Sequence, residues 1–134
     1  MSNKIKHMDY TQDIIKRMAD NSFKLKHWSV TLVSGLVALS LATKDKAAII
    51  GFSMIPITVF WILDGYFLWQ ERLFRNVYDE VRLKNESAID FKMNQMDFVG
   101  GKNTWIRTMF SQTIVVFYGS LLIVMIGVVL FLLK

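Results

Sequence analysis

The sequence predicts an all-α integral membrane protein with three transmembrane helices, a hairpin plus one, and amphipathic cytoplasmic helices. Three observations lead to this prediction. Hydrophobic residues make up 53% of the 134 residues and are gathered in long blocks, which is typical of helices in lipid. Only three residues separate the first two blocks. Lys and Arg lie almost entirely before the first block and between the second and third blocks, which a three-span chain places on the same side of the membrane. We expect a single membrane domain over residues 1–134.

The three apolar blocks have lengths that suit membrane spans. Residues 27–43, HWSVTLVSGLVALSLAT, contain no acidic residue and no Lys or Arg, and would form a helix of roughly 25 Å. Residues 47–69 would form one of roughly 34 Å, enough for a bilayer core of about 30 Å. The KDK turn at 44–46 is so short that these two helices must be antiparallel. Residues 111–133 form the third and most uniformly apolar span.

The distribution of basic residues predicts the orientation of the chain. Of the 16 Lys and Arg residues, only Lys44, Lys46 and Lys134 lie in the hairpin turn or at the C-terminus. The others lie in residues 1–26 and 70–108, which we therefore expect to be cytoplasmic. The predicted location is the bacterial inner (cytoplasmic) membrane, with the N-terminus inside and the C-terminus outside. A cleaved signal peptide is not expected, because a long polar segment precedes the first apolar block.

The N-terminal segment, residues 1–26, has the pattern of an amphipathic helix. Four apolar residues fall close to one helical face: Tyr10, Ile14, Met18 and Leu25. Asp9 and Thr11 are candidates for its N-cap. Two placements are possible for this helix. It lies on the inner leaflet with its basic residues toward anionic headgroups, or it packs against the second cytoplasmic helix, which we favour.

The segment 70–108 is predicted to begin as a helical arm that continues the second span to about Lys84 and to end as a loop. Opposite charges recur four residues apart, as Glu71–Arg75, Arg75–Asp79 and Glu80–Lys84, and Leu73, Val77 and Val81 form an apolar stripe. Asn103 or Thr104 would cap the helix of the third span.

Basic residues on this arm are a candidate anion site. Arg72, Arg75 and Arg82 could bind an anionic ligand, but interleaved acids neutralise most of the charge, so we favour a solvated, salt-bridged helix. No face is uniformly basic, and nucleic-acid binding is therefore not expected.

Asp64 lies in the second span, within FWILDGYFLWQERLFR at 60–75. A carboxylate at the centre of a bilayer costs about 2.5–3.5 kcal/mol, but Asp64 is only five residues before Trp69, at the expected inner interface. We therefore favour a polar contact that fixes helix packing, and keep a gating or ion-pathway role as the alternative. Four residues near the cytoplasmic ends of the other spans are candidate partners: Lys24, Lys26, His27 and Arg107.

Small residues recur on two of the spans. Ser34, Ala38 and Ala42 share a face of the first span, and Gly119 and Gly127 share a face of the third. Such faces let membrane helices approach closely, either within one protomer or between protomers. Both possibilities stay open, and neither face is polar enough to line a permanent aqueous pore.

The chain offers few groups for catalysis or metal binding. It has no cysteine and only two histidines, so we predict no metal site and no cofactor. A single intramembrane Asp cannot form an aspartic-protease dyad, which needs two carboxylates. We therefore predict a protein that is not an enzyme.

Two stretches carry a resemblance: RMADNSFKLKHW at 17–28 and LDGYFLWQERLFRNVYDEVR at 63–82. They resemble small bacterial inner-membrane proteins from anti-phage and nucleotide-signalling gene neighbourhoods, in particular the SLATT-type two-span effectors. The resemblance implies an effector that oligomerises and permeabilises the bilayer when a cytoplasmic sensor protein detects infection. The third span is a departure from that two-span plan, and the resemblance assigns no binding residue here.

Three functional hypotheses follow. The leading one is a non-enzymatic, homo-oligomeric membrane protein, a bacterial anti-phage effector that perturbs membrane permeability on activation. The first alternative is a scaffold or adaptor that recruits a cytoplasmic partner through residues 9–26 and 70–98. The second alternative is a small proton- or ion-coupled transporter that uses Asp64.

Overall fold

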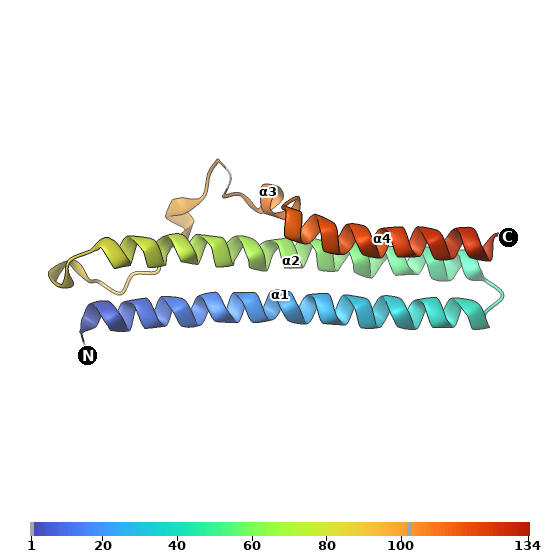
Figure 1. The fold of residues 1–134 in the computed structure, drawn as a ribbon, viewed down its shortest axis with the longest axis horizontal. Coiled ribbons are helices and arrows are strands. Elements are labelled where there is room, and N and C mark those ends of the chain that lie inside the picture. The colour runs from blue at the N-terminus through green and yellow to red at the C-terminus, as the bar shows by residue number, and fades with distance from the viewer. Residues whose placement is uncertain (1, 102) are drawn as a thin grey trace.

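The computed structural model describes residues 2–101 and 103–134, with only the backbone of Lys46 and Ile50. The chain forms two long helices, α1 (Asn3–Ala42) and α2 (Lys46–Leu83), which lie side by side over their whole length (Figure 1). The 3₁₀ helices η1 (Glu86–Ala88) and η2 (Gln95–Phe98) and the short helix α3 (Trp105–Met109) connect α2 to α4 (Gln112–Leu132). The described residues form no β-strand, which confirms the all-α prediction.

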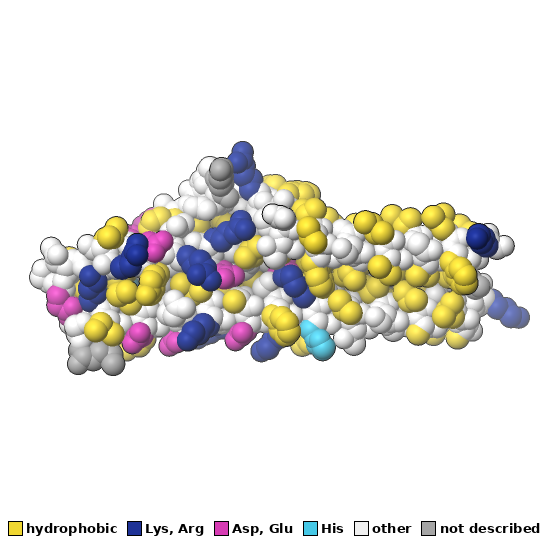
Figure 2. Space-filling view, in the orientation of Figure 1, with side chains coloured by type: hydrophobic (Ala, Val, Ile, Leu, Met, Phe, Trp, Pro, Cys, Tyr) yellow, Lys and Arg dark blue, Asp and Glu magenta, His cyan; other side chains and the backbone are white. Residues whose placement is uncertain are grey.

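Three of the helices, α1, α2 and α4, are long and apolar enough to cross a membrane. Charged side chains gather over one end of the molecule, and the other end is largely apolar on the face shown in Figure 2. We call residues 3–26, 70–101 and 103–104 the charged half, and residues 27–42, 47–69 and 112–132 the apolar half. Because α1 and α2 run through both halves without a break, each predicted cytoplasmic helix continues directly into a predicted span.

The start of α1 differs from the prediction. Ser2 is the N-cap and accepts a hydrogen bond from the backbone N–H of Ile5. The carboxylate of Glu86, which follows the end of α2, accepts the N–H groups of Asn3 at 2.6 Å and Lys4 at 3.2 Å. The proposed caps Asp9 and Thr11 were wrong, because the helix already has these earlier acceptors and continues through both positions.

The buried face of α1 was predicted only in part: of the predicted stripe, Leu25 is buried and Ile14 and Met18 are partly buried. Tyr10 is 54% exposed, whereas His7, Thr11 and Ile15 are buried. The inward face is therefore rotated by about one residue from the predicted apolar stripe, and much of it is polar. Three of its hydroxyl groups, on Thr11, Ser29 and Ser40, donate to carbonyls of the same helix, as Thr11 Oγ1 does to His7 O at 2.8 Å. Small side chains satisfied in this way let α2 approach α1 closely.

The stripe predicted on the α2 arm does face inward. Leu73, Val77 and Val81 are at most 3% exposed. Val77 and Val81 belong to a buried cluster with Ile15 of α1, and apolar residues of segment 85–99 pack against it. The N-terminal part of α1 thus packs against the arm of α2, as favoured. Of the predicted ion pairs, Arg75–Glu71 (2.9 Å) and Lys84–Glu80 (3.6 Å) form, whereas Asp79 instead lies 3.8 Å from Arg82.

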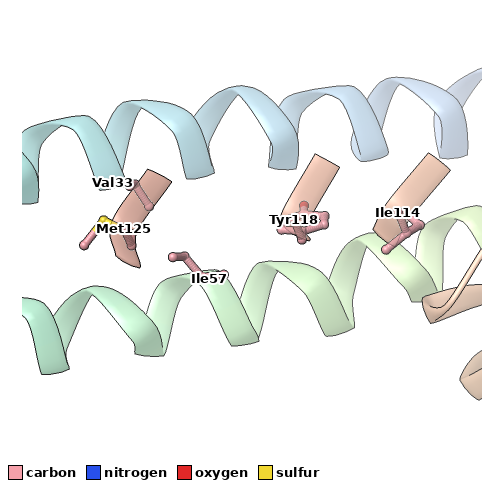
Figure 3. Close-up of a cluster of buried hydrophobic side chains, with 5 residues drawn as sticks. All are labelled: Val33, Ile57, Ile114, Tyr118 and Met125. Atoms are coloured by element: carbon pink, nitrogen blue, oxygen red, sulfur yellow. The ribbon is translucent and has the colours of Figure 1, made fainter. Parts of the chain in front are cut away.

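The third span is preceded by a separate short helix. Thr104 caps α3 by accepting the N–H of Arg107 at 3.3 Å, and α4 then begins at Gln112. In the apolar half, α4 packs over the α1–α2 pair. Figure 3 shows the buried cluster that joins the three helices, formed by Val33, Ile57, Ile114, Tyr118 and Met125.

Candidate functional site

Asp64 lies where the charged and apolar halves meet, and side chains from two other helices converge on it. Lys26 Nζ is 2.6 Å from Asp64 Oδ2, and Tyr118 OH donates to the same oxygen at 3.0 Å. Ser22 Oγ donates to Oδ1. Lys26 Nζ also donates to Ser22 Oγ at 2.9 Å, so the four side chains form one network. The network ties α1, α2 and α4 together at a single level.

Helix geometry explains why these residues meet. Ser22 and Lys26 are four residues apart, and therefore on the same face of α1. Asp64 and Tyr118 have no exposed surface, and Ser22 is 7% exposed, whereas the Lys26 side chain remains 21% exposed. A buried carboxylate needs a counter-charge and hydrogen-bond donors to offset its lost hydration, and Asp64 has both.

Among the four predicted partners of Asp64, only Lys26 contacts it. Lys24, His27 and Arg107 are exposed and lie outside the network. The sequence analysis missed Ser22 and Tyr118. A signal for Ser22 was present, since it precedes Lys26 by one helical turn. Tyr118 lies 54 residues beyond Asp64, so only the packing of α4 brings its hydroxyl group there.

Gly65, the residue after Asp64, makes room for α3. A Cβ atom at this position would lie 3.2 Å from Met109 Cα and would clash with Met109 Cγ. The indole N–H of Trp61 donates to the carbonyl of Met109 at 2.8 Å. Gly65 and Trp61 thus fix α3 against α2 beside the Asp64 network.

The aromatic residues at this level form a cluster. The rings of Trp69 and Trp105 stack with centroids 6.1 Å apart, and Tyr66 meets Trp105 edge-on at 5.2 Å. Trp69 was expected to face the membrane interface as an anchor. It is only 9% exposed, because the segment before α3 covers it, and its N–H donates to Asn103 O at 2.9 Å.

The small residues of α1 do not pack inside the protomer. Ser34, Ala38 and Ala42 are exposed. On α4, Gly127 is exposed and Gly119 is half-buried, and a Cβ atom added at either glycine would meet nothing within 4 Å. Both small-residue faces are therefore open in the single chain.

The basic residues of the arm do not form an anion site of their own. Arg75 and Arg82 are exposed and lie beside Glu71 and Asp79, and Arg72 is half-buried. Segment 85–99 lies against α1 and α2 in the charged half, where Glu86 accepts the N–H groups of Asn3 and Lys4 and apolar side chains pack on the buried cluster. The backbone N–H of Lys92 donates to the Asp90 carboxylate, which lowers the pKa of Asp90.

His7 is the buried histidine of the charged half. Its Nε2 atom lies 2.9 Å from the carbonyl of Lys92, and its ring packs near Phe91. Among the described residues, no group of three His, Cys, Asp or Glu side chains is placed to hold a metal ion.

The Asp64 network can hold α1, α2 and α4 in one relative position, because the buried carboxylate is paired with Lys26 and hydrogen-bonded to Ser22 and Tyr118. No known protein family, curated protein sequence or solved structure matches this chain.

Proposed function

We propose that the chain is a non-enzymatic, homo-oligomeric protein of the bacterial inner membrane that changes membrane permeability when its cytoplasmic half is engaged. The observation that carries this proposal is the Asp64 network, which joins all three candidate spans at the level where the charged half begins. Because α1 and α2 are continuous, a movement of their cytoplasmic parts is transmitted to the apolar half through this network.

Oligomerisation is the second part of the proposal. The described residues of a single copy form three candidate spans, and the cluster around Tyr118 fills the space that these helices share. A pathway for ions therefore needs several copies. The open faces at Ser34, Ala38 and Ala42 are suited to close helix contacts between copies. The resemblance to defence effectors supplies the expected stimulus, a cytoplasmic sensor protein that responds to phage.

The test combines liposomes with cells. In liposomes, the reconstituted protein is expected to dissipate a membrane potential that is set by a potassium gradient. Ala38→Trp is expected to reduce both the rate of this dissipation and the mass of the oligomer. Leu39→Trp is the matched control, because Leu39 is already large and 50% exposed. In cells, activation by phage should depolarise the inner membrane. An unchanged potential in infected cells that the protein protects would contradict the proposal.

An adaptor remains a second candidate, favoured by apolar side chains on the surface of the charged half. These side chains are between 39% and 78% exposed: Ile5, Tyr10, Leu83, Phe91 and Met96. A stoichiometric soluble partner that co-purifies with the chain, without ion release from liposomes, would favour this function.

A transporter that uses Asp64 is the third candidate. It requires Asp64→Asn to abolish ion flux without changing assembly. The buried, paired state of Asp64 instead favours a structural role, for which Asp64→Asn weakens assembly and flux together.

A further inference from the structure

A groove of about 590 Å³ runs along α4 on the side that faces α1. It forms because α4 packs mainly on α2 and only lightly on α1. Lys26 of α1 lines it beside Phe117, whose ring centre lies 5.8 Å from Lys26 Nζ. Gln112 and Thr113 line it at the start of α4, and Val116, Ser120, Leu121 and Val124 line it further along. The lining along α4 therefore begins with two polar residues and continues mostly with apolar ones; the hydroxyl group of Ser120 donates to Val116 O of the same helix.

The polar end of the groove favours an anion. Lys26 lines it with a side chain that is 21% exposed, whereas its partner Asp64 has no exposed surface, so an approaching ligand meets Lys26 and not the carboxylate. Gln112 and Thr113 are also the first two residues of α4. Its N-cap residue, Ser111, makes no capping hydrogen bond with its side chain. The N-terminus of a 21-residue helix carries a partial positive charge and free N–H groups, which suit a phosphate.

The length of the groove suits a lipid chain. From Gln112 to Val124, α4 rises by roughly 18 Å. One leaflet of a bilayer has about half of the 30 Å hydrocarbon thickness, or roughly 15 Å. An amphiphile with its phosphate at Lys26 would thus extend one hydrocarbon chain to about the middle of the membrane.

We propose that this groove binds one anionic phospholipid of the inner leaflet. Its phosphate lies against Lys26 and the first turn of α4, and one acyl chain lies along Val116, Leu121 and Val124. The bound lipid would cover the gap between α1 and α4 beside the Asp64 network. The proposal depends on the membrane insertion proposed above, but not on ion conduction.

The test measures lipid bound to the full chain after purification in detergent and removal of endogenous lipid. The probes are palmitoyl-oleoyl phosphatidylglycerol and the corresponding diacylglycerol, which has the same chains and no phosphate. Native mass spectrometry is expected to show one phosphatidylglycerol per chain, bound at least about tenfold more tightly than diacylglycerol, since a hydrogen bond to a charged group is worth about that factor. Equal binding of the two probes would overturn the phosphate site.

Two pairs of variants locate the site. Val124→Trp fills the groove, whereas Ile123→Trp adds the same ring at a neighbouring position that is 71% exposed and does not line it. Gln112→Glu places a negative charge at the polar end, where a helix N-terminus tolerates it, and Gln95→Glu makes the same change in η2. We expect Val124→Trp and Gln112→Glu to weaken phosphatidylglycerol binding at least about tenfold, with both controls unchanged.

Two results would contradict this location. Equal lipid binding by Val124→Trp and Ile123→Trp would show that the lipid binds elsewhere. A change of oligomer mass in Val124→Trp, with lipid binding retained, would show that a second copy occupies the groove. Ion release from liposomes is measured on the same preparations, so loss of lipid binding is distinguished from loss of the proposed conduction.

Discussion

At the scale of single residues, Asp64 combines burial with a full set of partners. Its two oxygens accept from Ser22, Lys26 and Tyr118, and it has no exposed surface. A buried pair of this kind adds little net stability compared with apolar residues, but removal of one partner leaves an uncompensated charge. The main effect of the network is therefore to penalise arrangements of the helices in which Asp64 loses Lys26.

Lys26→Met tests this penalty. The substitution keeps most of the side-chain length but leaves Asp64 without its counter-charge, so we expect a loss of about 3 kcal/mol, the lower end of the range for a buried pair because Lys26 is 21% exposed. Unfolding of the detergent-solubilised protein by sodium dodecyl sulfate measures this loss. Lys24→Met is the control, because Lys24 is exposed and lies outside the network.

The double variant Lys26→Met/Asp64→Asn separates charge from packing. The neutral amide oxygen can still accept from Ser22 and Tyr118, so at least half of the lost stability should return. A double variant as unstable as the single one would show that the loss in Lys26→Met does not come from the uncompensated charge of Asp64.

At the scale of elements, α1 and α2 are long unbroken helices, and single residues determine how the segment between α2 and α4 packs against them. Gly65 lets α3 lie against α2, and Glu86 joins the segment after α2 to the first turn of α1. Each contact depends on a single side chain or its absence, and each is testable by one substitution.

Gly65→Ala should displace α3. The added Cβ atom would meet backbone and side chain of Met109, and overpacking of this kind costs about 1–3 kcal/mol. Gly51→Ala, in the same helix with nothing within 4 Å of the added atom, should instead be neutral or stabilising by about 0.5–1 kcal/mol. Thermal unfolding followed by tryptophan fluorescence checks both. Equal midpoints for the two variants would argue against a close α2–α3 contact.

Glu86→Ala should loosen the first turn of α1. Loss of a capping carboxylate costs about 1 kcal/mol, which corresponds to roughly fivefold faster amide exchange at Asn3 and Lys4 if local opening controls exchange. Hydrogen–deuterium exchange with mass spectrometry measures this rate. Glu80→Ala should leave it unchanged, because Glu80 pairs with Lys84 on the surface of α2.

At the scale of the whole molecule, most charged side chains lie toward one end of the long axis, and the rest of the molecule is mainly apolar on the face shown in Figure 2. If the chain inserts as proposed, the hairpin turn and the charged half lie on opposite sides of the bilayer. Because the sequence has no cysteine, a single introduced thiol reports its own side.

Lys44→Cys, in the hairpin turn, should react with a membrane-impermeant maleimide in spheroplasts. Lys92→Cys, in the charged half and also exposed, should react only after permeabilisation. The extent of labelling on a gel measures the difference. Labelling of Lys92→Cys in intact spheroplasts would reverse the proposed orientation.

The sequence by itself determined the all-α class, three helices long enough to span a membrane, the tight hairpin turn and the end of the α2 arm near Lys84. These features depend on local hydrophobicity, periodicity and charge, which are properties of neighbouring residues. It also identified Asp64 as the residue that needs a partner, and included Lys26 among four candidates.

Only the tertiary structure decided which partners Asp64 has and which face of α1 is buried. The inner face of α1 mixes Ser, Thr and His with Ile15, Leu25 and Val33. The apolar stripe therefore predicted it only in part: Leu25 is buried, but Tyr10 is 54% exposed. Tyr118 and Glu86 act across 54 and more than 80 residues of sequence. Such contacts depend on how helices pack and how a connecting segment folds back, which no local pattern of residues encodes.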